Sequence, residues 1–226
     1  MILRTPQFAV RAGSLAMIAL VAALAGSRPG GADPSSASTT LRNAAEFSSI
    51  SNQADRSRAL FEEIGKVLTN PRCMNCHPAG DHPLQGDDSH EHVPPIWRGE
   101  TGHLEVSCSG CHSGKNFSLH EAATYRSIPG HPRWGFAPLS MAWEGKSLGD
   151  ICRQLKDVQR NGGRVLAALQ EHIAKDDLVA WGWNPGEGRK PAPGSQKEAG
   201  ELVQAWIDSG GVPALTQAKI RTLRRP

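Results

Sequence analysis

The chain has 226 residues, a formal net charge of +3 at pH 7 and 38% hydrophobic residues. Because the charge is small and no run of lysines or arginines stands out, the sequence argues against a nucleic-acid-binding protein. The low apolar content, with 24 glycines and 16 prolines, is typical of a loop-rich fold with a thin core, and the length suits one domain with terminal segments.

The first 25 residues have the pattern of a secretory signal peptide. Arg4 and Arg11 supply the positive start, residues 12–24 are uncharged and mostly apolar, and Ala-Leu-Ala at 23–25 offers a small-residue cleavage site. We therefore expect residues 1–25 to direct export and the mature protein to be periplasmic. The apolar run is shorter than the roughly 20 residues of a membrane-spanning helix, so no stable membrane span is expected after cleavage. An uncleaved anchor is the alternative.

Three further segments follow from composition and periodicity. Residues 26–50, rich in Ser, Ala, Gly and Thr, predict a flexible leader. Residues 51–213 are expected to form the domain and residues 214–226 a C-terminal tail. From residue 51, apolar residues recur at three- and four-residue steps and predict a helix that Asn70-Pro71 ends. The apolar residues of this helix are Leu60, Phe61, Ile64, Val67 and Leu68.

Two stretches, residues 73–77 and residues 108–112, share the pattern Cys-x-x-Cys-His. This pattern is the attachment signature of a c-type haem. The two thiols form thioethers with the haem vinyl groups, and the histidine that follows binds the iron. The sequence therefore predicts two covalently attached haem c groups. The predicted attachment residues are Cys73, Cys76, Cys108 and Cys111, and the predicted proximal iron ligands are His77 and His112.

The two motifs begin only 35 residues apart. A separate cytochrome domain around each haem would need roughly 80 to 100 residues, so the two haems are expected to share one fold. Residues 78–107 between the motifs lack a helical period and predict a long loop packed against a haem. The expected fold class is mainly α with long irregular loops and little or no β, like a compact multihaem cytochrome c.

Later in the chain, three capping boxes predict further helices. They lie at residues 118–121, 147–150 and 195–198, where a serine precedes an acidic residue by three positions. The second box is expected to open a helix with Ile151, Leu155 and Val158 on one face. An apolar stripe over residues 166–173 predicts another helix between the second and third boxes.

The residues that bind each iron opposite the proximal histidine must approach from elsewhere in the chain. The best candidates are His92, Met141 and His172. His92 precedes a stiffening Val-Pro-Pro sequence, and a methionine opposite a histidine would raise the reduction potential. We prefer His92 and Met141 and keep His172 in reserve. The alternative for Met141 is that it packs in the core. The alternative for His172 is an ordinary core or surface histidine whose hydrogen bonds are satisfied without a metal.

Cys152 is the fifth cysteine and has no partner if the other four carry haem. It follows Ile151 on a predicted helix, and we expect a buried, inert thiol. A reactive free thiol and an intermolecular disulfide are the alternatives.

Several stretches together resemble a family of small secreted dihaem c-type cytochromes. Besides the two Cys-x-x-Cys-His motifs, they are Pro83–Asp88, Met141–Lys146, Ile151–Asp157, Arg160–Arg164, Trp181–Trp183 and Ala205–Asp208. Members of this family are often labelled as subunits of an isoquinoline 1-oxidoreductase-like system. The resemblance, over about residues 70–211, implies a redox partner protein: a molybdenum hydroxylase that oxidises an N-heterocycle or an aldehyde and passes the electrons on.

We therefore expect a periplasmic cytochrome that moves single electrons between an oxidoreductase and a downstream acceptor, without catalytic chemistry of its own. The alternative is a small dihaem peroxidase-like enzyme with one open iron site, in which Glu91 or Glu121 would be the acid–base residue. A structural zinc module built from the two Cys-x-x-Cys pairs is a third interpretation. The histidine after each pair and the export signal disfavour it.

Overall fold

The computed structural model describes residues 39–98, 107–119 and 127–214. The predicted signal peptide, most of the predicted leader and all of the predicted tail except Ala214 lie outside the described residues. Among the described residues, no helix is both long enough and apolar enough to span a membrane.

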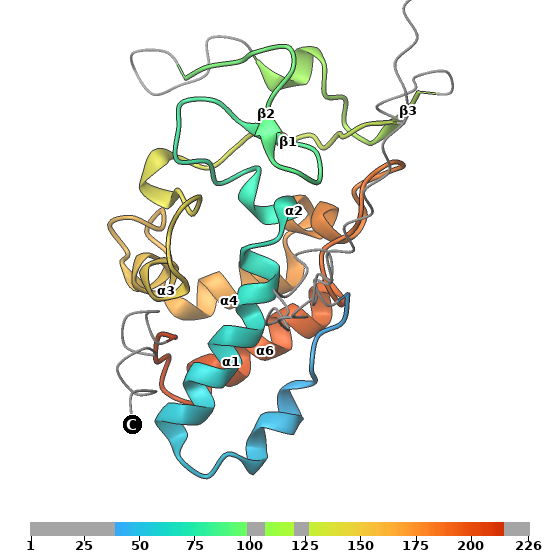
Figure 1. The fold of residues 1–226 in the computed structure, drawn as a ribbon. Helices are drawn as coiled ribbons and strands as arrows, with labels where there is room; N and C mark the ends of the chain where they lie inside the picture. Colours follow the sequence, from blue (N-terminus) through green and yellow to red (C-terminus); the bar gives the residue numbers. More distant parts are fainter. Residues whose placement is uncertain (1–38, 99–106, 120–126, 215–226) are drawn as a thin grey trace, which may run out of the picture. The chain divides into compact units, whose positions relative to one another are not determined.

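Three helices form the packed centre of the described part: α1 (Gln53–Leu68), α4 (Leu166–Lys175) and α6 (Gln196–Asp208). Both α1 and α4 pack against α6. Figure 1 shows these helices together, with the loops around β1 and β2 beyond the C-terminal end of α1. The prediction of a mainly α fold is confirmed.

Shorter elements connect the three helices. The remaining α-helices are α2 (Pro71–Met74), α3 (Leu148–Lys156) and α5 (Asp177–Ala180). Four 3-10 turns are η1 (Ala44–Ser49), η2 (Cys108–Gly110), η3 (Leu139–Met141) and η4 (Trp181–Trp183). Two antiparallel pairs of two-residue strands are β1 (Leu84–Gln85) with β2 (His90–Glu91) and β3 (Phe117–Ser118) with β4 (Ser127–Ile128). Such short strands agree with the expected low β content.

The apolar period of α1 produces a buried face as predicted. Its five apolar residues are each at most 3% exposed: Leu60, Phe61, Ile64, Val67 and Leu68. Asn70 then accepts a hydrogen bond from the Arg72 N–H and caps α2, with Pro71 at the first helical position. The buried helix α1 is thereby joined directly to the first Cys-x-x-Cys-His motif.

Two of the three capping boxes are confirmed. Ser147 accepts a hydrogen bond from the backbone of Asp150 at the start of α3, and Ser195 accepts one from Glu198 at the start of α6. The box at residues 118–121 runs into residues outside the described ones; Ser118 itself pairs with Ser127 in a small sheet. The placement of Val158 is wrong: α3 ends at Lys156, and Val158 is 42% exposed.

The predicted leader is wrong for its last part, because residues 39–50 belong to the fold. Phe47 in η1 is 1% exposed and packs in the hydrophobic core. The Arg42 N–H donates to the Glu63 carboxylate on α1 at 2.9 Å. The small polar residues around Phe47 suggested flexibility, but one buried aromatic ring and the Asn43 cap are enough to order this turn.

Candidate cofactor site

The first Cys-x-x-Cys-His motif forms a compact turn at the end of α2. The Cys76 N–H donates to the Cys73 carbonyl at 3.1 Å, and the His77 N–H donates to the Met74 carbonyl at 2.9 Å. These short-range bonds bring both thiols and the His77 ring to one side of the chain, where all three border the same cavity. The local sequence thus places the three chemically active groups of the motif together.

This cavity, called cavity 1 here, has a volume of about 360 Å³. Such a volume lies in the range of small-molecule sites, roughly 300 to 1,000 Å³. Its walls come from the core faces of α1, α4 and α6, and their apolar lining residues are Ile64, Val67, Leu68, Leu169, Ile173, Ala199 and Val203. Cavity 1 is therefore a mostly apolar space inside the helical core, bordered by two thiols and an imidazole.

The His77 ring is fixed in the tautomer that suits a metal ligand. Its Nδ1 donates to the Met141 carbonyl at 2.7 Å, and its face stacks on Trp143 with ring centroids 3.6 Å apart. Because a carbonyl can only accept, Nδ1 carries the proton and the Nε2 lone pair is free. Burial lowers the pKa of His77 to about 4, which keeps the ring neutral.

The structure places both His172 and Met141 on the border of cavity 1. His172 comes from α4, and a charge on it would lower the pKa of His77, so the two imidazoles interact electrostatically. Met141 lies in the hydrophobic core, and its carbonyl is the acceptor for His77 Nδ1. Since Nε2 lies on the other side of the ring from Nδ1, the Met141 backbone lies away from the free nitrogen of His77.

The second motif borders a smaller cavity, called cavity 2 here, of about 130 Å³. The His112 N–H donates to the Cys108 carbonyl at 2.8 Å, which closes a tight turn like that of the first motif. Cys108, Cys111 and His112 all border cavity 2. The volume is below the usual range for a ligand site, so the described residues enclose only part of a porphyrin-sized group.

His92 lies across cavity 2 from the motif. The ring centroids of His92 and His112 are 5.9 Å apart, and both rings border the cavity. His112 Nδ1 donates to the Pro129 carbonyl at 2.7 Å, and His92 Nδ1 donates to the Pro94 carbonyl at 2.8 Å. Burial also lowers the pKa of His112. Cavity 2 therefore has two imidazoles with free Nε2 atoms.

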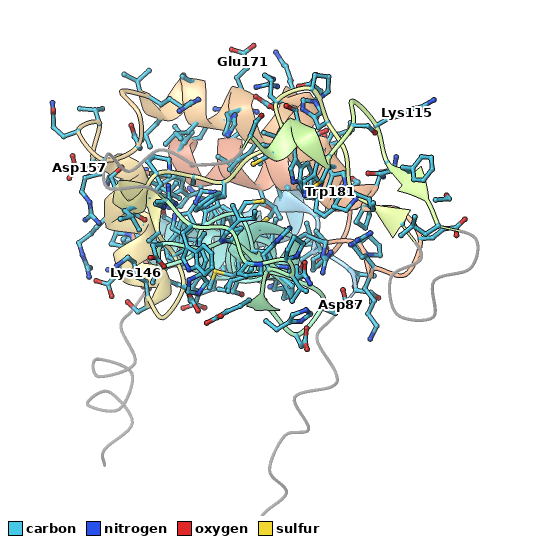
Figure 2. The ribbon with its side chains drawn as sticks, turned by 90° about the horizontal axis from the view of Figure 1, so that it is seen from above. Asp87, Lys115, Lys146, Asp157, Glu171 and Trp181 are labelled. Atoms are coloured by element: carbon cyan, nitrogen blue, oxygen red, sulfur yellow. The ribbon has the colours of Figure 1, made fainter. Side chains whose placement is uncertain are left out.

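The two cavities share a wall. The residues that border both are Arg72, Cys76, Trp134, Gly135, Phe136 and Trp181. Trp134 stacks on His112 with centroids 5.1 Å apart and meets the edge of Trp181 at 4.8 Å. Figure 2 shows Trp181 among closely packed side chains, whereas Glu171 and Lys115 extend at the outer edge of the view. The two candidate sites are thus neighbours within one fold, separated by aromatic side chains.

The thiols of Cys73, Cys76 and Cys152 have raised pKa values but differ in whether they border a cavity. Burial raises the pKa of Cys73 to about 12 and that of Cys76 to about 11. Burial likewise raises the pKa of Cys152 to about 12, and Cys152 packs in the core without bordering either cavity. These surroundings agree with an inert Cys152 thiol and with Cys73 and Cys76 thiols that face an apolar ligand, whereas Cys111 of the second motif is exposed.

Polar groups at the cavities fit the propionates of a haem. The Trp143 Nε1 atom is buried and has no hydrogen-bond acceptor among the described residues. Arg164 also borders cavity 1, and its guanidinium suits a carboxylate; Arg72 and Arg133 border the cavity too, but they already pair with Asp87 and with Asp176 and Asp177. An apolar cavity with two thiols, neutral imidazoles and cationic groups at its border fits a haem c.

Zinc fits these residues poorly. Among residues 39–98, 107–119 and 127–214, no group of three or more His, Cys, Asp or Glu side chains is close enough together to hold a metal ion. A zinc ribbon needs four converging ligands, so this arrangement of the two Cys-x-x-Cys pairs does not favour the zinc-module interpretation. A haem iron needs only one or two protein ligands, since the porphyrin supplies the others.

Sequence reasoning missed Asp176, whose carboxylate accepts from His172 Nδ1 at 3.1 Å. The i, i+4 spacing of the two residues at the end of a predicted helix is a signal that could have found this pair.

No protein-family model matches the chain, and searches of curated proteins and of solved structures found no match. The resemblance to dihaem cytochromes and the molybdenum hydroxylase partner that it implies therefore stay predictions.

Proposed function

We propose that the protein is an exported dihaem c-type cytochrome that moves single electrons between an oxidoreductase and a downstream acceptor. One observation carries the proposal: each Cys-x-x-Cys-His motif borders a cavity that a second histidine also borders. In both motifs the Nδ1 of the histidine is bound to a backbone carbonyl, which leaves Nε2 for a metal. If the motif were repeated by chance, there would be no reason to expect a second histidine at each cavity or a bound Nδ1 in each motif histidine.

The residues have separate roles in this proposal. Cys73 and Cys76 anchor the first haem, and Cys108 and Cys111 anchor the second. His77 and His112 are the proximal ligands, and His172 and His92 are the second ligands. The core faces of α1, α4 and α6 give cavity 1 its apolar lining. A bound haem supplies a one-electron couple at its iron, which the protein tunes through ligands and burial.

The arrangement favours an electron carrier over a peroxidase-like enzyme. With a histidine on each side of the metal, neither iron would keep a position for peroxide. Glu91, the acid–base residue considered for an enzyme, is exposed on β2 and pairs with His82 at 3.3 Å. Glu121 lies outside the described residues.

The shared wall supports exchange of electrons between the two haems. Cys76 borders both cavities, and Trp134 and Trp181 fill the space between them. A pair of neighbouring redox centres lets an electron enter at one surface and leave at another. The signal-peptide pattern supports a periplasmic location, and the family resemblance supports a molybdenum hydroxylase as the electron donor.

The test is a pyridine haemochrome assay on the full chain, matured by a c-type biogenesis system. We expect two covalent haems per chain. The Cys73→Ala/Cys76→Ala and Cys108→Ala/Cys111→Ala variants should each bind one haem, and Cys152→Ala, the matched control, should keep two. The absence of covalent haem from the unaltered chain would show that the proposal is wrong.

A further inference from the structure

The four histidines proposed as iron ligands differ in the group that accepts their Nδ1 hydrogen. His77, His112 and His92 each donate to a neutral backbone carbonyl. His172 instead donates to the carboxylate of Asp176, with Nδ1 and Oδ2 3.1 Å apart. A carboxylate partner raises the basicity of an imidazole ligand more than a carbonyl does, because it is negatively charged.

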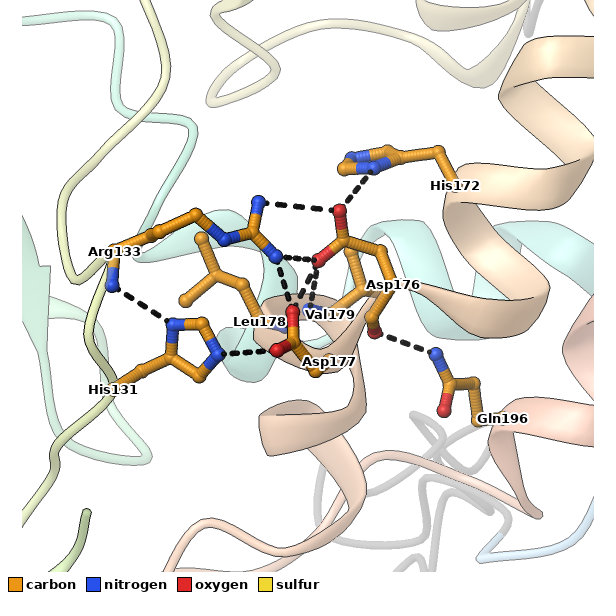
Figure 3. A network of polar contacts seen from close by, with 8 residues as sticks. All are labelled: His131, Arg133, His172, Asp176, Asp177, Leu178, Val179 and Gln196. Atoms are coloured by element: carbon orange, nitrogen blue, oxygen red, sulfur yellow. Dashed lines mark hydrogen bonds and ion pairs between the residues drawn. The ribbon is translucent and has the colours of Figure 1, made fainter. Parts of the chain in front are cut away.

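Asp176 is held firmly at the junction of α4 and α5, as Figure 3 shows. Its Oδ1 accepts from the Leu178 N–H at 2.8 Å, so the side chain caps α5. Its backbone carbonyl accepts from Gln196 at the start of α6 at 2.9 Å. The side chain is 17% exposed. Burial would raise the pKa of Asp176, but hydrogen bonds from Arg133 and Leu178 lower it to about 2.

Arg133 joins this junction to the loop before η3. Its guanidinium donates to both carboxylate oxygens of Asp176, at 2.9 and 3.4 Å, and also to Asp177. His131 accepts from the Arg133 backbone N–H at 3.0 Å and pairs with Asp177 at 3.3 Å. Asp177 thus shares Arg133 with Asp176, but its contacts among the described residues do not include His172, which makes it a natural control.

We propose that Asp176 is a positioning residue that holds the His172 ring and, through its negative charge, lowers the reduction potential of the haem in cavity 1. The inference rests on the proposed function, since it requires His172 as the second ligand of that haem. Arg133 balances part of the Asp176 charge and so limits the effect. The potential of the haem in cavity 1 is then lower than it would be without the Asp176 carboxylate.

The test compares Asp176→Asn with Asp177→Asn in the full holoprotein by spectroelectrochemical titration. Both variants remove one negative charge near Arg133, and asparagine caps α5 as well as aspartate does. Asp176→Asn should raise the midpoint potential of one haem, leave the other unchanged and alter the low-spin electron paramagnetic resonance (EPR) signal of the same haem. Asp177→Asn should change the potential much less and leave that signal as it is. Equal shifts in the two variants, or no shift in either, would overturn the inference.

Arg133→Gln supplies a second test with the opposite sign. Loss of the guanidinium leaves the Asp176 carboxylate unbalanced, so the midpoint potential of the same haem should fall. A rise would contradict the inference, even if Asp176→Asn failed to fold. Haem content is measured for every protein: an unaltered chain without two haems refutes the proposed function, whereas two haems with an unmoved potential refute only the role of Asp176.

Discussion

The choice between His172 and Met141 as the second ligand in cavity 1 depends on where each residue lies relative to the two ring nitrogens of His77. Both residues border the cavity, and His77 uses its Nδ1 to bind the carbonyl of Met141. The free Nε2 of His77 therefore lies on the side of the ring away from this carbonyl. His172 approaches from another helix and has its own Nδ1 bound to Asp176. The geometry favours His172 over the methionine that the sequence argument preferred.

Substitution of His172 by alanine should open one coordination position. We expect a high-spin fraction of about half of the total haem and new binding of carbon monoxide by the reduced protein, seen in the visible difference spectrum. Met141→Leu, which nearly conserves volume, should keep the low-spin spectrum. Carbon monoxide binding by Met141→Leu, with an unchanged spectrum for His172→Ala, would show that Met141 is the ligand.

At the scale of the elements, α4 and α6 determine where His172 lies. The two helices are in close contact where Gly200 faces Ala174, two residues beyond His172. A Cβ atom placed on Gly200 would lie 2.5 Å from the Cβ of Ala174, which is too close for two carbon atoms. The missing side chain at Gly200 is therefore what allows α4 to pack against α6 at this distance.

Gly200→Ala tests this contact. Alanine is favoured over glycine within a helix by about 1 kcal/mol, so helix propensity alone predicts greater stability. We expect instead a loss of roughly 1 to 3 kcal/mol from overpacking, measured by urea unfolding of the holoprotein with far-UV circular dichroism. The double variant Ala174→Gly/Gly200→Ala should recover most of the loss, because it restores the space. A more stable Gly200→Ala protein would contradict the packing argument.

At the scale of the whole described fold, the two cavities differ in their relation to the core. Cavity 1 lies among the residues of α1, α4 and α6 that hold these helices together. A haem in cavity 1 would contact all three helices, and core space left unfilled lowers stability. Cavity 2 is bordered by loops and is much smaller.

Loss of the first haem should therefore disrupt the fold more than loss of the second. We expect the Cys73→Ala/Cys76→Ala variant to lose near-UV circular dichroism and to be cut quickly by protease. The Cys108→Ala/Cys111→Ala variant should keep the helical core and resist the same protease. Equal sensitivity of the two variants would mean that cavity 1 is not filled by a haem in the stable protein.

Several local features could be predicted because they depend on residues a few positions apart. The apolar stripe of α1, the Ser147 and Ser195 caps and the spacing within each Cys-x-x-Cys-His motif are of this kind. The same local reasoning failed at Phe47, because η1 packs not only on the neighbouring α1 but also on α6, which lies far along the chain.

The sequence by itself determined which groups are available for chemistry: two pairs of thiols, each pair followed by an imidazole, in a chain whose first residues have the pattern of a signal peptide. Only the tertiary structure decided which partners those groups meet. His172 shares a cavity with His77, and His92 shares one with His112, although long stretches of chain separate His77 from His172. Such pairings depend on the packing of α4 against α6 and on the loops around the motifs, and no short-range pattern records them.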